Sequence, residues 1–282
     1  MRKPVVAGSF YPGSFTGLQR QIEDCFKHPL GPGALPGEGR SAERHTLGLV
    51  SPHAGYIYSG PVAANGFSRI AAEKKPGTVV IVGPNHRGLG AAVAVGREGT
   101  WQTPLGTVEV DVGVGEAIVS AGHWAKWDDL AHSMEHSLEV QVPFLQYIYG
   151  SEFKIVPIAM LRQEWEIARD LGLAIAAALK GKDGLVIASS DFSHRESQAS
   201  ASRKDRMVLD AILSLDPARL EETVNSHNIS MCGPGPVMAM ITACKELGAK
   251  KANLLRYATS GDTSGNYSEV VGYASVAVTT GA

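Results

Sequence analysis

Residues 46–56 read TLGLVSPHAGY, a stretch that joins a short apolar run to a loop containing His53. An apolar run of this length that ends at a Ser-Pro pair is typical of a buried β-strand followed by a tight connection. Pro52 restricts the backbone immediately before His53, so the imidazole has little freedom to move. We therefore predict a strand over residues 46–51 that places His53 at its carboxyl end.

The same arrangement occurs twice more along the chain. Residues 78–82 lead directly into GPNH, which ends at His86, and residues 185–188 lead into SSDFSH, which ends at His194. In open α/β sheets the ligand crevice lies beyond the carboxyl ends of the strands, where loops from several strands converge. A single histidine after a strand is usually only a loop residue. Three at equivalent positions predict a shared site for His53, His86 and His194, provided that the strands are parallel neighbours.

Strand and helix patterns alternate along the rest of the chain. Further β-branched runs occupy residues 153–159, 253–258 and 270–278. Helical spacing of apolar residues is found at residues 15–26, 61–72, 113–121, 163–178, 197–213, 217–226 and 234–247. This alternation predicts an α/β fold in which helices cover both faces of a sheet.

Two details complete the predicted architecture. Residues 91–95 and 107–110, with the turn residues 104–106 between them, predict a small antiparallel ribbon beside the main sheet. The one linker-like stretch, residues 29–45, lies too near the N-terminus to separate two domains, so we expect a single domain over residues 1–282.

Composition excludes several classes of protein. The 282 residues are 44% hydrophobic and carry a formal net charge of -2, which argues against a disordered chain and against electrostatic binding to nucleic acid or membrane surfaces. The three cysteines are too few for a disulfide framework and fit a reducing compartment. The residues after Met1 lack the apolar stretch of a signal peptide, and the longest apolar run, residues 173–179, is too short to span a bilayer. We expect a cytoplasmic protein with no nucleic-acid or membrane partner.

A fourth histidine lies in the segment EHSLEVQ, residues 135–141. Pro143 would break or kink a helix over this segment. Glu135 and Glu139 are either surface carboxylates or groups that orient a ligand histidine. The residues leave open whether His136 lines the site. Structural or surface roles are predicted for the other five histidines, His28, His45, His123, His132 and His227.

The three cysteines also separate by position. Cys25 and Cys244 lie on apolar helical stripes and are predicted to be in the core. Cys232 lies in a Gly/Pro loop directly before the helix that begins at Pro234, and a helix N-terminus favours the thiolate, the form that binds metals. Two interpretations of Cys232 stay open here: a metal ligand, or a nucleophile paired with His194. The Gly/Ser/Thr-rich residues 259–267 predict either an anion-binding nest or an ordinary turn.

These motifs resemble the Memo family, known in bacteria and archaea as the AmmeMemoRadiSam system protein B. The resemblance runs nearly end to end and keeps one order. Its segments are VAGSFYP (6–12), SPHAGYIYSG (51–60), GPNH (83–86), EHSLE (135–139), SSDFSH (189–194), MCG (231–233), TSGD (259–262) and VGYAS (271–275).

The resemblance implies a fold similar to the class III extradiol dioxygenases, which are non-haem iron enzymes with a central mixed, mostly parallel β-sheet between helical layers. In those relatives two histidines and a carboxylate hold Fe(II). The resemblance places His53 and His86 as the imidazole ligands and Cys232 where the carboxylate would be. His194, with Asp191, resembles the acid/base histidine of the dioxygenases, and His136 is a further candidate for the catalytic group.

Two departures from the pattern affect the expected chemistry. A thiolate is softer than a carboxylate, which shifts the preference toward Cu, Zn or a thiolate-ligated iron, so ring cleavage no longer follows from the resemblance. We expect one metal ion, Fe(II) first, with Cu or Zn as alternatives. Pro234 stands where many relatives have Arg, so a contact of that Arg with a substrate anion would be missing here.

The sequence is therefore compatible with three functions. The first is a mononuclear metal site that supports an oxidative or redox reaction on a small molecule. The second is a non-catalytic module that binds a peptide or a companion protein of the AmmeMemoRadiSam system, such as its radical S-adenosylmethionine enzyme. The third is a Cys-dependent hydrolase or transferase, which requires Cys232 Sγ within hydrogen-bond reach of His194. The sequence does not specify the substrate or the oligomeric state.

Overall fold

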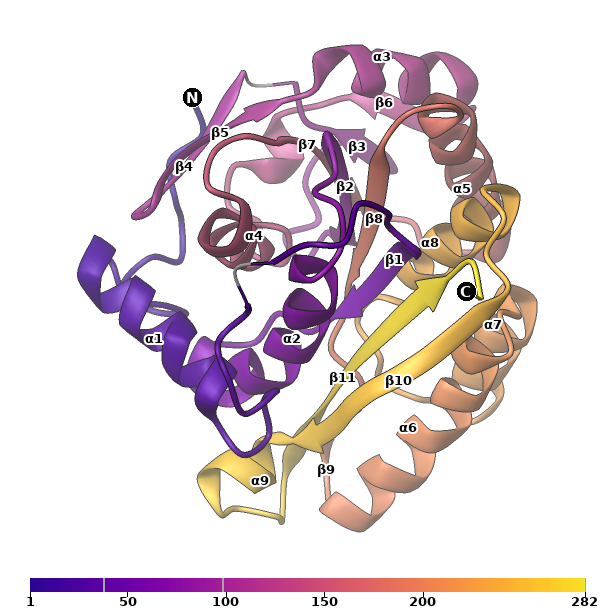
Figure 1. Cartoon of the computed structure of the whole chain (residues 1–282). Coiled ribbons are helices and arrows are strands. Elements are labelled where there is room, and N and C mark those ends of the chain that lie inside the picture. The colour runs from indigo at the N-terminus through magenta and orange to yellow at the C-terminus, as the bar shows by residue number, and fades with distance from the viewer. Residues whose placement is uncertain (38, 98, 282) are drawn as a thin grey trace.

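A central β-sheet lies between two layers of helices in the computed structural model, which describes residues 1–37, 39–97 and 99–281 (Figure 1). The main sheet has the strand order β10-β11-β1-β8-β2-β7-β3-β6. Its strands, together with the shorter β4, β5 and β9, are β1 (Thr46–Ser51), β2 (Thr78–Pro84), β3 (Val93–Val95), β4 (Thr100–Thr103), β5 (Gly106–Val110), β6 (Ala125–Trp127), β7 (Lys154–Met160), β8 (Gly184–Ser189), β9 (His194–Glu196), β10 (Lys251–Thr259) and β11 (Val270–Thr279).

The four central strands β1, β8, β2 and β7 run parallel, whereas β10, β11 and β3 pair with antiparallel neighbours. This arrangement confirms the predicted mixed, mostly parallel sheet. Nearly all residues of the four central strands are buried, as expected for strands covered on both faces. Alternate residues of β2 enter two separate cores: Val80 and Val82 face one helical layer, and Val79 and Ile81 face the other.

The helices divide between these two faces. One layer contains α1 (Phe15–Lys27), α2 (Tyr56–Ala71) and α4 (Val142–Tyr149). The other contains α3 (Val112–Ala121), α5 (Trp165–Leu179), α6 (Gln198–Leu213), α7 (Pro217–Ser226) and α8 (Pro234–Glu246). Two 3-10 turns, Leu130–His132 and Glu139–Gln141, precede α4.

The predicted strands and helices lie within a few residues of the observed ones, except at the start of the second helix and in the ribbon beside the main sheet. The second helix begins at Tyr56 rather than at Pro61, which lies inside it. The earlier start is supported by tertiary contacts that no local pattern contains, because Tyr56 N donates to Phe10 O and Tyr56 Oη donates to Val140 O. Pro143, expected to break a helix, instead lies at the start of α4, where its missing N–H costs nothing.

The predicted ribbon is wrong in one of its two strands. Gly106–Val110 pairs with Thr100–Thr103 in an antiparallel hairpin, while Val93–Val95 joins the main sheet beside β7.

Residues 259–267 contain the short helix α9 (Ser260–Ser264), capped reciprocally by Thr259 and Asp262. Asp262 therefore uses a carboxylate oxygen on the backbone, and the segment is a capped helical turn.

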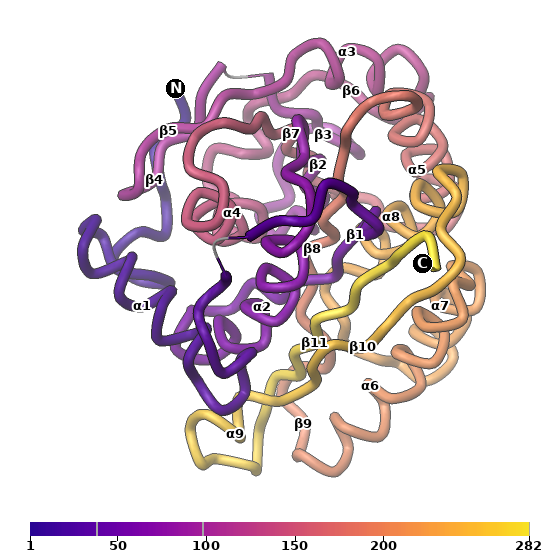
Figure 2. Tube along the Cα trace, in the orientation of Figure 1, coloured from indigo at the N-terminus to yellow at the C-terminus, as the bar shows by residue number. Residues whose placement is uncertain are grey.

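The N-terminal segment is tied to the fold by one buried carboxylate. Glu139, 1% exposed, accepts hydrogen bonds from Arg2 Nη1 at 2.7 Å, from Tyr11 Oη at 2.7 Å, and from the backbone N–H groups of Val5 and Val6. Arg2 also stacks over the Trp101 ring of β4, so the N-terminus runs beside that strand (Figure 2). Glu139 was one of two glutamates whose role the sequence left open, and it is buried rather than on the surface.

Replacing Glu139 by Gln should destabilise the protein strongly, because the Arg2 guanidinium would keep its burial and lose its anionic partner. Breaking one partner of a buried ion pair costs about 3–5 kcal/mol. The free energy of unfolding in urea measures the loss. Glu109→Gln, which removes the exposed partner of Lys154, is the matched control and should change stability little. Equal effects of the two substitutions would contradict this role for Glu139.

Candidate metal centre

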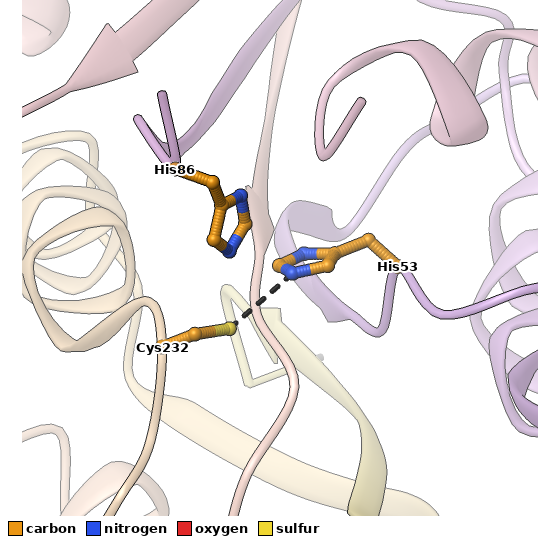
Figure 3. A group of neighbouring side chains, drawn as sticks. All are labelled: His53, His86 and Cys232. Atoms are coloured by element: carbon orange, nitrogen blue, oxygen red, sulfur yellow. Dashed lines mark hydrogen bonds between the residues drawn. The ribbon is translucent and has the colours of Figure 1, made fainter. Parts of the chain in front are cut away.

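The carboxyl ends of β1, β8 and β2 lie side by side, and the predicted histidine loops follow them. His53 follows β1 and His86 follows β2, while Cys232 comes from the loop directly before α8. The three side chains point toward one another (Figure 3). Their ligand atoms all lie within 4.8 Å of one another, and His53 Nε2 is 3.3 Å from Cys232 Sγ.

A buried carboxylate fixes the orientation of His86. Glu135 accepts from the His86 backbone N–H at 2.6 Å and lies 2.9 Å from its Nδ1. Burial opposes the charged form of Glu135, but the hydrogen bond and charge of His86, together with backbone donors, hold the pKa of the carboxyl well below its usual range. An ionised carboxylate only accepts, so Nδ1–H of His86 donates to Glu135, and in the neutral imidazole Nε2 carries the lone pair that a metal needs.

His53 is almost completely enclosed, at 2% exposure. Burial is the main reason that the pKa of its imidazole lies well below the ordinary value, so the ring is neutral. Its backbone N–H donates to Asp191 Oδ1 at 2.8 Å, and its Nδ1 lies 2.9 Å from Ser189 Oγ. Asp191 therefore holds the loop, and Ser189 holds the ring at Nδ1, the nitrogen farther from Cys232.

The protonation state of Cys232 differs from the sequence-based expectation. Its position before a helix suggested a stabilised thiolate, but burial raises the pKa of the thiol well above its ordinary value, and the neighbouring charge of Asp191 adds to this. The loss of hydration around the sulfur outweighs the helix N-terminus, although the Cys232 residue as a whole is only partly buried. Without a cation the group is a thiol, and a bound metal would deprotonate it.

The other predicted residues lie around this group. His136 stacks on His86 with ring centroids 4.7 Å apart and faces His53 at 5.5 Å. Asp191 Oδ2 is 4.0 Å from His53 Nε2, and burial raises the pKa of Asp191 to about 6. His194 Nδ1–H donates to the Ser230 carbonyl at 2.8 Å, which leaves Nε2 of His194 as an acceptor.

A second set of possible ligand atoms, on His86, Glu135 and His136, shares a residue with the first. The two oxygens of Glu135 already accept N–H groups from His86, from its ring and backbone, and from the backbone of His136 and Ser137. A carboxylate engaged in this way orients its neighbours rather than offering a free ligand. Of the two roles open for Glu135, surface carboxylate or group that orients a ligand histidine, we therefore assign the second.

The nucleophile arrangement is not formed in the part of the chain that the structure describes. Cys232 Sγ contacts His53, Asp191 and Ser190, with no hydrogen bond to His194. Asp191 binds the His53 backbone instead of the His194 ring. A Cys-His-Asp relay lacks both of its links.

The remaining histidines and cysteines are structural or peripheral. Cys25 and Cys244 are buried in the core as predicted. His132 is also buried, and its Nε2–H donates to the Ala94 carbonyl at 3.1 Å. Sequence reasoning missed Ser189 and Ser230, which hold His53 and His194, because isolated serines give no local signal of a long-range hydrogen bond.

At least two of the three donors are close enough to share one metal ion. Metal bonds to imidazole nitrogen and thiolate sulfur are about 2.1 Å and 2.3 Å long, so donors less than about 4.4 Å apart can share one ion. His53 Nε2 and Cys232 Sγ satisfy this at 3.3 Å. Together, the parallel-stranded α/β sheet and this cluster define the class: an α/β protein with a possible metal site of two histidines and one cysteine at the strand ends.

Comparison with known proteins identifies the family. A family model described as "Memo-like protein" matches residues 2–277, and the chain belongs to the Memo family. It is 49% identical to the MEMO1 family protein MK0963 of Methanopyrus kandleri over 98% of each chain. It is also 52% identical to the MEMO1 family protein PAE0818 of Pyrobaculum aerophilum over 98% of each chain.

Among solved structures, the uncharacterized protein JW3007 of Escherichia coli has a similar fold. Its TM-score is 0.59 at 13% identity, over 83% of this chain and 100% of that one. At that identity the likeness supports the α/β architecture alone.

In the described part of the chain, no helix combines the length and apolar character needed to cross a membrane.

Metal-free protein should show low thiol reactivity at Cys232, because a buried thiol with a raised pKa offers little thiolate. At neutral pH we expect alkylation by iodoacetamide to be at least about tenfold slower than that of free glutathione. Peptide mass spectrometry over time measures the rate at each cysteine, with buried Cys244 as the internal reference. Rapid, selective labelling of Cys232 would instead support a nucleophilic cysteine.

Proposed function

We propose that this protein holds one metal ion between His53, His86 and Cys232 and supports an oxidative or redox reaction on a small molecule. The observation that carries the proposal is the convergence of three ligand atoms within 4.8 Å of one another, two from the loops that follow β1 and β2 and one from the loop before α8. Fe(II) is the first candidate, and Cu or Zn is compatible with a donor set of two imidazoles and a thiolate.

The ion would supply redox capacity and a Lewis-acid position for substrate. The chain supplies the surroundings. His53 and His86 are neutral donors held by their Nδ1 sides, and Cys232 adds one negative charge when deprotonated. His136 packs against His86 and closes one side of the cluster.

Proton transfer is assigned to His194. The Ser230 carbonyl accepts Nδ1–H, so Nε2 of His194 is the atom that accepts a proton from a substrate. Asp191 supports the site by holding the backbone N–H of His53 rather than by pairing with His194.

The proposed ligands predict which substitutions remove the bound metal and which do not. Wild-type protein purified without oxygen should contain about one metal ion per chain, and His53→Ala or Cys232→Ser should remove it while the folded circular dichroism spectrum persists. His194→Gln should keep the metal because His194 is not a ligand. Exposed His227→Ala is the control for loss of any histidine. Wild-type protein that takes up no metal after anaerobic reconstitution with Fe(II), Cu or Zn would contradict the proposal.

A binding module is the second candidate, favoured by exposed apolar side chains on the segments that carry the histidines. Ile57, Leu89 and Met134 are 63%, 39% and 52% exposed. They lie within four residues of His53, His86 and His136, respectively. Such side chains suit a peptide or a companion protein of the AmmeMemoRadiSam system.

The two functions respond differently to metal. For the binding module, a peptide or companion protein should bind with the same affinity before and after metal removal, and Met134→Ser together with Ile57→Ser should weaken it. Fluorescence anisotropy measures both effects. Binding that disappears with the metal would count against a metal-independent module.

A further inference from the structure

Behind the cluster, on the side away from Cys232, lies a set of buried polar side chains that no ligand role uses. Ser189, Ser137 and Gln141 are each 1% exposed or less. Ser189 is the last residue of β8, and Gln141 ends the 3-10 turn before α4. Buried polar groups are costly unless they are hydrogen-bonded, so their bonds can be traced completely.

The bonds of Ser189 determine which nitrogen of His53 carries the proton. The Ser189 hydroxyl donates its only hydrogen to the Ser137 carbonyl at 2.6 Å, and it accepts from Gln141 Nε2 at 2.9 Å. Gln141 Nε2 also donates to the Pro52 carbonyl at 3.0 Å, which fixes the orientation of the amide. Ser189 can therefore only accept from His53. Nδ1–H of His53 donates to Ser189, and Nε2 is left with a lone pair facing Cys232.

Ser137 connects this arrangement to the other histidine. Its N–H donates to Glu135, which holds the His86 ring, and its hydroxyl donates to the Pro84 carbonyl two residues before His86. A Cβ added at Gly83 would lie 2.7 Å from Ser137 Oγ, so glycine permits this close approach. One short segment, residues 135–141, is therefore bonded to the supports of both rings.

We infer that Ser189, held by Gln141 and Ser137, is a positioning residue that presents Nε2 of His53 to a metal, and that residues 135–141 orient both histidine ligands. This inference rests on the proposed metal site. If the acceptor at Ser189 is removed, a proton on Nε2 becomes competitive, because Cys232 Sγ at 3.3 Å and Asp191 Oδ2 at 4.0 Å both lie near that atom. A proton there occupies the position that the metal needs.

The decisive comparison is Ser189→Ala against Ser51→Ala. Ser51 lies directly opposite Ser189 in the β1–β8 register and is equally buried, but its hydroxyl has no hydrogen-bond partner among the residues that the structure describes. The two substitutions remove the same atom from neighbouring positions, and only one removes the acceptor for His53. Neither serine is a ligand.

Two readouts are taken on full-length protein. The first is the dissociation constant for Co(II), measured by chelator competition, with the sulfur-to-cobalt charge-transfer band reporting coordination by Cys232. The second is the tautomer of His53 in metal-free protein, measured by long-range ¹H–¹⁵N correlation at alkaline pH. Ser189→Ala should weaken Co(II) binding about 10–100-fold and add the Nε2–H form of His53, as for the loss of a hydrogen-bond partner behind a metal ligand. Ser51→Ala should match wild type in both.

Unchanged Co(II) affinity and a pure Nδ1–H tautomer in Ser189→Ala would overturn the inference. If wild-type protein binds no metal, the proposed function fails, and the tautomer measurement still decides the role of Ser189. Gln141→Met is the second variant, used if Ser189→Ala does not fold. It removes the donor to Ser189 and keeps the hydroxyl, so it should shift the same two readouts by a smaller amount, and no shift in either would also overturn the inference.

Discussion

Parallel pairing of β1, β8 and β2 is the constraint on which the site depends. The register places Ser51 opposite Ser189 and Val82 opposite Ala188, so the three strands end at nearly the same level. Loops that are more than 100 residues apart in the sequence therefore begin beside one another. Because the strands are buried on both faces, a one-residue shift in register would move every side chain to the opposite helical layer and disrupt both cores, so the packing of the sheet fixes where the histidines lie.

The second requirement is the buried polar chemistry of residues 135–141. Glu135 supports the His86 ring, Ser137 accepts from Ser189, and Glu139 secures the N-terminal segment. Burying these groups costs hydration, and each is compensated by several hydrogen bonds. The result is a rigid backing for two imidazoles, which matters because a metal site depends on donors that are already in place.

Much of this could be predicted from the sequence, and the exceptions have physical causes. The strands and the convergence of His53 and His86 follow from local apolar runs and a general property of parallel sheets. The start of α2 and the supports at Ser189 and Ser230 could not be predicted, since they depend on contacts between distant segments. At Cys232 the loss of hydration, which no local motif reveals, raises the pKa of the thiol and opposes the effect of the helix N-terminus.

The proposed function requires two histidines and one cysteine to bind a single metal ion at the strand ends. X-ray absorption at the metal edge of the reconstituted wild-type protein tests it most directly. We expect one sulfur neighbour at about 2.3 Å together with imidazole nitrogens at about 2.1 Å, and loss of the sulfur in Cys232→Ser. A wild-type spectrum with only oxygen and nitrogen neighbours, unchanged in Cys232→Ser, would contradict it.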